Sequence, residues 1–175
     1  MRRYWLVFGV VAMVLGSGCQ ATGMGWIPSL LVPTDKATFG FVYDGTTMTF
    51  SGSYHDPQGQ TAFGVVEVAF KGTGVLRPCK AGDPACAKAP ATGAKGGCLF
   101  GIASYTSQNP KVPDIEPADL QRVSLLICDG DGTLGSGSPV TDDFILISVD
   151  SGPYMGYTNG GTPSGNITVR SDVSP

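Results

Sequence analysis

The sequence is poor in charged residues and in histidine. Charged side chains make up 14% of the 175 residues, and His55 is the single histidine. A typical soluble domain has about a quarter of its residues charged, so this composition excludes a highly charged disordered chain. The formal net charge is −3, and phosphate binding needs the opposite sign. We therefore expect no nucleic-acid partner.

The hydrophobic segment near the start of the sequence is too short to cross a bilayer. Residues 5–15 form an apolar run of eleven residues, whereas a spanning helix needs about twenty. The run follows Arg2 and Arg3 and ends at the small residues 16–18, just before Cys19. This order is typical of a cleaved export signal rather than of a transmembrane helix.

The segment that ends at Cys19 resembles a bacterial lipoprotein signal peptide. In the commonest form of that motif a Leu lies three residues before the Cys, but here Gly16 is at that place and Leu15 is one residue further back. The resemblance implies that residues 1–18 are removed and that the Cys19 sulfur carries a diacylglyceryl group, with palmitate among its acyl chains. Gln20, in place of Asp, resembles the pattern of lipoproteins sent to the outer membrane. The alternative is an ordinary secretory signal, with Cys19 as a spare thiol.

The chain that remains after cleavage has the size of one domain. Its 157 residues are enough to bury roughly two-thirds of the unfolded surface. Loss of Arg2 and Arg3 changes the formal charge from −3 to −5. We expect residues 19–25 to be a short tether and residues 26–175 to form the domain.

Four cysteines are left once Cys19 is assigned to lipid. An even number in an exported chain indicates two disulfides, and three pairings are possible. Cys79 and Cys86 flank a Gly-Asp-Pro turn that brings them close. Cys98 and Cys128 lie at the ends of two strand-like runs whose antiparallel pairing sets them opposite each other. A zinc site is the competing interpretation, but the spacings are not zinc-like.

The remaining pattern is that of an all-β protein. Gly and Pro, 26 and 13 residues, separate short runs rich in β-branched and aromatic residues. The Asp44-Gly45 and Asp129-Gly130 pairs predict two-residue hairpin turns. We expect a single antiparallel β-sandwich or small closed barrel of about eight strands. The predicted strands are 37–43, 46–54, 62–71, 72–77, 98–105, 122–128, 143–149 and 165–170.

A second resemblance is carried by six stretches in order along the chain: 23–28, 36–41, 54–56, 70–74, 123–130 and the segment from 156–157 to 166–169. Together they resemble a secreted bacterial β-module, the post-COAP domain. The resemblance implies an extracellular β-fold with no catalytic residues to carry over. The chain departs from it in the loop that bears the first two domain cysteines and at Cys128.

The acidic run around Asp129 is a candidate calcium site. Carboxylate oxygens are ligands that Ca²⁺ prefers, but an EF-hand would need Gly at residue 134 and Glu at residue 140, where the chain has Leu and Val. A solvated turn is the favoured interpretation, and we expect no cofactor. The weak candidate ligands are Asp129, Asp131, Asp142 and Asp143.

Two further motifs have a functional and a structural interpretation. His55 and Asp56 are adjacent, but neighbours in a strand point to opposite faces, so a catalytic dyad is not expected. Tyr154, Tyr157 and Asn159 lie among glycines and can either form a weak binding face or pack a β-corner.

These observations predict a lipid-anchored cell-envelope module, structural or binding, without catalytic activity. Its expected partners are the membrane, through the anchor, and an envelope protein or glycan. The alternative is a small β-barrel carrier of an apolar ligand in the periplasm or at the outer membrane. Its pocket would be lined by Phe39, Phe41, Phe50 and Ile145 and would enclose several hundred Å³.

Overall fold

A computed structural model describes residues 19–80, 82–88, 97–130 and 143–169. These residues form nine strands and one 3₁₀ turn, and every paired strand is antiparallel. The elements are β1 (Cys19–Pro28), β2 (Lys36–Asp44), β3 (Thr49–Thr61), β4 (Gly64–Pro78), η1 (Pro84–Cys86), β5 (Gly97–Ser107), β6 (Arg122–Asp129), β7 (Phe144–Val149), β8 (Thr158–Gly161) and β9 (Ser164–Val169).

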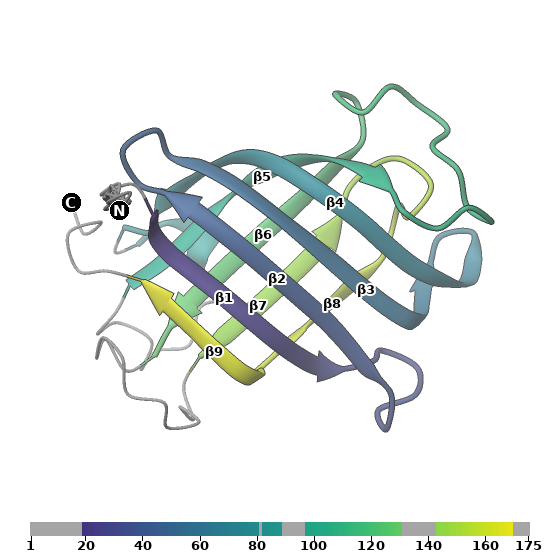
Figure 1. Cartoon of the computed structure of the whole chain (residues 1–175), viewed down its shortest axis with the longest axis horizontal. Coiled ribbons are helices and arrows are strands. Elements are labelled where there is room, and N and C mark those ends of the chain that lie inside the picture. Colours follow the sequence, from purple (N-terminus) through teal and green to yellow (C-terminus); the bar gives the residue numbers. More distant parts are fainter. Residues whose placement is uncertain (1–18, 81, 89–96, 131–142, 170–175) are drawn as a thin grey trace, which may run out of the picture.

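The strands make one sheet, which confirms the all-β prediction. Its order is β8-β7-β6-β5-β4-β3-β2-β1-β9, so consecutive strands from β1 to β8 are neighbours. Figure 1 shows that the sheet curls, with β1 to β4 in front and β6 and β7 behind them. The curl turns one face of every strand toward a shared interior.

Period-two alternation decides which side chains fill that interior. On β2, Phe39, Phe41 and Tyr43 are buried while the residues between them are exposed or half-buried. On β7, Ile145 and Ile147 are buried in the same way. Because side chains alternate between the faces of a strand, this pattern lines the inside with apolar groups and leaves the outside to solvent.

Aromatic rings form a continuous cluster within the core. The rings of Phe70 and Tyr105 lie 5.1 Å apart, and Phe70 also contacts Tyr54 and Tyr154 at 5.6 and 6.4 Å between centroids. Tyr54 in turn lies 5.8 Å from Tyr157. These separations are within the range of favourable ring contacts, so the tyrosines act as core residues with a polar end.

The two outermost strands of the sheet are consecutive in the chain. β8 pairs with β7 and β9 pairs with β1, and only residues 162–163 separate them. Buried carboxylates link the β6–β7 side to β9, since Asp143 accepts from the Ile167 N–H and Asp129 from the Val169 N–H, each at 2.7 Å.

Two predictions about the strands are wrong, and one further strand was not predicted. Residues 19–25 are not a tether, because they form most of β1 and pair with both β2 and β9. The runs 62–71 and 72–77 are one strand, β4, since Gly72 and Gly74 continue its pairing with β3 and β5. β8 was not predicted, because a strand of Thr-Asn-Gly-Gly carries no apolar alternation.

The turn after Asp44 is longer than the predicted two residues. β2 ends at Asp44 and β3 begins at Thr49, and the Asp44 carboxylate accepts from the Thr46 and Thr47 N–H groups at 2.8 and 3.4 Å. Met48 closes the turn with a φ of 56°. The side chain of Asp44 thus organises a four-residue connection, which an Asp-Gly pair alone does not reveal.

Candidate functional site

Cys19, the predicted acylation site, is the first residue of β1. Its backbone pairs with Asp44, the last residue of β2. The residues that follow it are held on both sides of the strand, with Ala21 opposite Tyr43 on β2 and Val169 on β9. At most Gln20 therefore separates a group attached to Cys19 from the part of β1 that is paired on both sides.

Both predicted disulfides are present. Cys79 and Cys86 are bonded across the η1 turn, where Asp83 accepts from the Ala85 N–H at 3.0 Å. Cys98 and Cys128 are bonded across β5 and β6, in the register that sets Phe100 opposite Leu126. The second bridge links two neighbouring strands through cysteines that are 30 residues apart in the sequence.

A buried polar cluster lies where β1, β3 and β8 meet, and Asp56 is its centre. The Asp56 side chain is fully buried, and it accepts from the Tyr157 hydroxyl at 2.7 Å, the Gln58 N–H at 3.0 Å and the Ser29 hydroxyl. The Leu30 N–H is a fourth donor at 3.4 Å. Four donors and no acceptor fit a carboxylate, which needs such bonds to be stable away from water.

The donors continue in a chain away from Asp56. Because the Tyr157 proton goes to Asp56, the Tyr54 hydroxyl must donate to the Tyr157 oxygen, with which it is in contact. The Tyr54 oxygen in turn accepts from Asn159 Nδ2 at 3.1 Å, and the same amide donates to the Pro28 carbonyl at 3.0 Å. The cluster thus connects β8 to the end of β1 through side chains.

Burial makes ionisation of these tyrosines unfavourable. It raises the pKa of Tyr157 far above the ordinary value of 10, and the neighbouring Tyr54 and Asp56 raise it further. Burial also raises the pKa of Tyr54 well above 10, although the hydrogen bond that its oxygen accepts from Asn159 acts in the opposite direction. Burial raises the pKa of Tyr105 to about 12. All three phenols therefore stay neutral in the folded protein at neutral pH, and they serve packing and hydrogen bonding.

The structure supports the packing interpretation of the weak binding residues Tyr154, Tyr157 and Asn159. Both tyrosines are fully buried, and Asn159 is 7% exposed. Tyr154 donates to the Ala69 carbonyl at 3.0 Å and lies 2.7 Å from the Ser107 hydroxyl. Their polar atoms are thus committed to neighbours inside the fold.

The described calcium candidates, Asp129 and Asp143, hold backbone groups. Besides the bonds to β9, Asp143 accepts from the Gly130 N–H at 3.0 Å. Asp131 and Asp142 lie outside the described residues. Among the residues that the structure describes, no three His, Cys, Asp or Glu side chains gather as a metal site would require.

His55 and Asp56 point to opposite sides of β3, as the strand period predicts. His55 Nε2 lies 2.9 Å from Glu67 Oε1 on the exposed surface, whereas Asp56 is in the core. An exposed pair of this kind contributes little to stability.

Side chains fill the interior at the place where a carrier of an apolar ligand, the alternative function, would need its pocket. The cavity among Phe39, Phe41, Phe50 and Ile145 has a volume of about 20 Å³, which holds roughly one water molecule. The several hundred Å³ expected for an apolar ligand are not found in this part of the described structure. Nearby rings, such as Phe41 against Phe50 at 5.9 Å, occupy that space.

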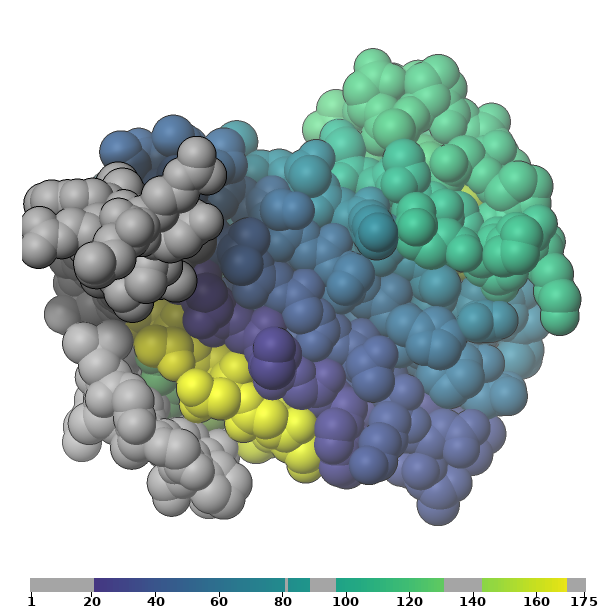
Figure 2. Space-filling model, viewed as in Figure 1, coloured from purple at the N-terminus to yellow at the C-terminus, as the bar shows by residue number. Residues whose placement is uncertain are grey.

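The larger hollow lies on the outer face. It has a volume of about 660 Å³, crosses β1 to β5 and continues into a second hollow of about 430 Å³. Figure 2 looks onto the front of this face, where the green loop between β5 and β6 stands out from the strands. The residues common to both hollows are Met24, Gly40, Ser53 and Lys71.

Comparison with known proteins and structures gave no match. No family model, no curated protein and no solved structure matches it. The resemblance to the post-COAP domain therefore stays a prediction. No helix among the described residues has the length and apolar character needed to cross a bilayer.

Proposed function

We propose that the protein is a lipid-anchored module of the bacterial cell envelope, at the outer membrane, with a structural or binding role and no catalytic activity. The observation that carries the proposal is that the backbone of Cys19 pairs with Asp44 on β2, so this residue is joined directly to the sheet. A lipid at this residue would hold the β-body directly at a membrane. Two disulfides agree with an oxidising compartment outside the cytoplasm.

The anchoring step is the transfer of a diacylglyceryl group. The Cys19 sulfur forms a thioether bond to the glyceryl carbon of a phosphatidylglycerol donor, the glycerol phosphate headgroup leaves, and the thiol proton is released. Hydrolysis of the 18–19 peptide bond then frees the new amino terminus. Each buried methylene contributes roughly 0.8 kcal/mol, so two or three acyl chains give lasting attachment.

Labelling with radioactive palmitate in a bacterial host tests the anchor. The wild-type chain should carry label and float with membranes, and the Cys19→Ser variant should do neither. A conservative serine keeps the start of β1, so loss of label reports the thiol and not the fold. An unlabelled wild-type chain that retains residues 1–18 would overturn the proposal.

We also propose that the curled sheet works as a small closed barrel. The support is the pair of carboxylates, Asp129 and Asp143, that accept from β9 across the side of the sheet where no strand ladder runs. Asp143→Ala should speed amide hydrogen exchange at Ile167, because that N–H loses its acceptor. Asp150→Ala, on an exposed aspartate bonded to the Ser124 hydroxyl, is the control that should leave Ile167 unchanged. Equal exchange in both variants would contradict closure by these carboxylates.

The binding role is assigned to the outer hollow. The hollow is lined by hydroxyl groups and by Lys71, and Gly40 leaves its floor open because it has no side chain. Such a lining suits a glycan or an extended segment of an envelope protein. A thermal-shift screen of the Cys19→Ser chain against calcium, glycans and fatty acids tests this, since a ligand of the folded state raises the melting temperature. A rise with glycans alone would identify the partner class. If the melting temperature did not change with any of the three, the structural role would be favoured over the binding role.

A further inference from the structure

An exposed apolar strip runs across the outer face from the end of the sheet where Cys19 lies. Met48, Val75 and Ile102 are 48%, 59% and 45% exposed. Each is a large hydrophobic side chain on a different element: the β2–β3 turn, β4 and β5. A soluble surface can carry single residues of this kind without explanation, but contiguous ones mark a contact surface.

The register shows that the strip is contiguous with the Cys19 end. Cys19 pairs with Asp44, Asp44 with Thr49 and Thr49 with Val75. Val75 then lies directly opposite Ile102. Met48 precedes Thr49, and its carbonyl accepts from the Leu76 N–H at 3.0 Å, which fixes the turn beside β4. Neighbouring strands are about 4.8 Å apart, so Val75 is roughly 15 Å from Cys19.

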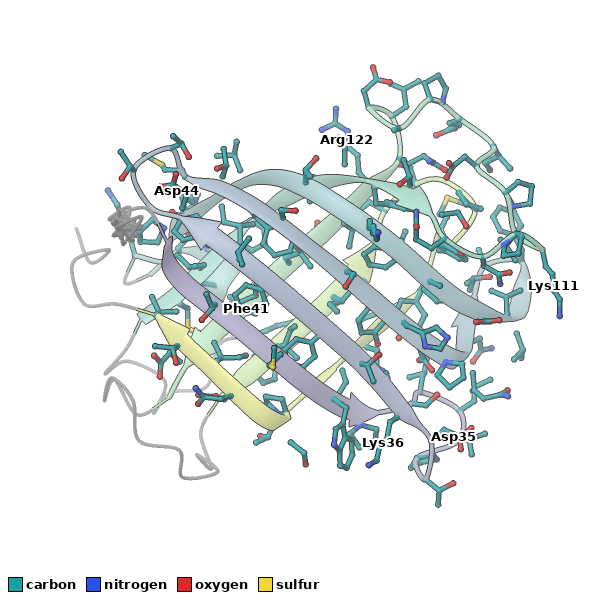
Figure 3. The ribbon with its side chains drawn as sticks, in the orientation of Figure 1. Asp35, Lys36, Phe41, Asp44, Lys111 and Arg122 are labelled. Atoms are coloured by element: carbon teal, nitrogen blue, oxygen red, sulfur yellow. A yellow bond between two sulfur atoms is a disulfide. The ribbon has the colours of Figure 1, made fainter. Side chains whose placement is uncertain are left out.

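Basic groups lie beside the strip. Arg77 is two residues from Val75 on the same face of β4, and its guanidinium lies 5.7 Å from the ring of Phe100. Arg122 is exposed on β6, and Figure 3 shows it pointing away from the sheet on the same upper side as Asp44. Arg77 is ion-paired with Asp83, so that pair adds no net charge, and among the described residues Arg122 forms no ion pair. Asp44 and Asp150 accept hydrogen bonds from neutral donors, which do not cancel the charge of a carboxylate.

We propose that this strip rests on the lipid headgroup region, so that the acylated protein lies with one side of its sheet against the bilayer. The inference rests on the proposed anchor at Cys19, because acyl chains at that residue bring this end of the sheet to the membrane. Exposed apolar side chains suit the interfacial zone, where hydrocarbon and anionic phosphate lie within a few ångströms of each other, and Arg122 is the arginine beside the strip that is free to reach a phosphate. The opposite end, with Phe63 and Val65, then points away from the lipid.

The test uses tryptophan as a depth probe in the acylated full chain. Trp26 is replaced by Phe, and a single Trp is introduced by Val75→Trp or, as matched control, by Val65→Trp. Both valines are on β4 and their exposed fractions are 59% and 58%, so only their position differs. The proteins are reconstituted into vesicles of phosphatidylethanolamine and phosphatidylglycerol with brominated acyl chains, which quench tryptophan at the interface.

Quenching should be at least about threefold stronger for the probe at position 75 than for that at position 65, because only the first meets the interface. Ile102→Trp should behave as Val75→Trp does and provides a second probe if the first variant folds poorly. Equal quenching at 75 and 65 would overturn the inference.

Flotation and sedimentation separate this result from other failures. A chain that does not float with the vesicles contradicts the anchor itself. A chain that floats with equal quenching contradicts only the orientation. A Cys19→Ser chain that sediments as a dimer, and becomes monomeric on Val75→Thr, would assign the strip to a second copy and overturn the lipid contact.

Discussion

The Tyr157 hydroxyl donates a 2.7 Å hydrogen bond to Oδ2 of Asp56, across 101 residues of sequence. This bond joins the segment before β8 to the middle of β3 and ends a donor chain that starts at Asn159. Such a long-range polar link inside the core favours one arrangement of the strands, because an arrangement that moved Tyr157 away would remove a donor from a buried carboxylate.

Tyr157→Phe should lower the free energy of unfolding by about 1–3 kcal/mol, since Asp56 loses a donor in a site that water does not reach. Tyr105→Phe is the comparison, because that hydroxyl donates to the neutral Ser151 carbonyl at 2.8 Å and its loss should have a smaller effect of about 1 kcal/mol. Urea unfolding of both variants in the Cys19→Ser chain measures the difference. If Tyr157→Phe left the free energy of unfolding unchanged, the hydrogen bond to Asp56 would make no net contribution to stability.

Stability should fall as the pH rises above about 10. The folded-state pKa values of Tyr54, Tyr105 and Tyr157 are raised, so between the ordinary value of 10 and the folded value the unfolded chain releases protons that the native state keeps. Their contribution is complete below pH 10 and is lost above it. Melting temperatures between pH 8 and 11.5 should show this fall, and tyrosinate absorbance should rise together with unfolding. Ionisation of all tyrosines before unfolding would contradict the burial of these phenols.

The sequence predicted the parts of the fold that depend on local patterns. The Cys98–Cys128 bridge followed from setting two alternating runs side by side, and the core face of β2 followed from Phe39, Phe41 and Tyr43. β1 escaped detection because Gly23 and Gly25 weaken its pattern. The structure explains these glycines, since a Cβ at Gly23 would lie 2.3 Å from the Phe41 ring and one at Gly25 would lie 2.8 Å from the Ser164 carbonyl oxygen.

The Asp56 cluster was missed because its members come from three distant segments. One signal was present: Phe50 and Tyr54 share the buried face of β3, and Asp56 is the next residue on that face. Period-two alternation thus predicts a buried aspartate and therefore a set of donors. Which donors approach it depends on the curl of the sheet, and no local pattern encodes that.

The two disulfides should contribute unequally to stability. Cys98 and Cys128 close a loop of 30 residues, and Cys79 and Cys86 close one of 7. The chain-entropy relation gives about 3–4 kcal/mol for the first and about 2 kcal/mol for the second. The paired variants Cys98→Ala/Cys128→Ala and Cys79→Ala/Cys86→Ala, compared by urea unfolding, measure each. If the short loop proved the more stabilising, the entropic account would be wrong for this protein.

Gly101→Ala should disrupt the fold, whereas Gly40→Ala should be tolerated. A Cβ at Gly101 would lie 2.1 Å from the Val75 carbonyl oxygen and 2.9 Å from the Leu76 Cα, so backbone of β4 would have to move. A Cβ at Gly40 has no atom within 4 Å. Overpacking against backbone should cost about 3 kcal/mol or prevent folding, while Gly40→Ala should change stability by less than about 1 kcal/mol. Circular dichroism and thermal unfolding of the two variants provide the measurement. Both residues are strand glycines and differ mainly in what surrounds them. If the Gly101→Ala and Gly40→Ala variants were equally stable, β4 and β5 would not be packed as closely at Gly101 as their pairing requires.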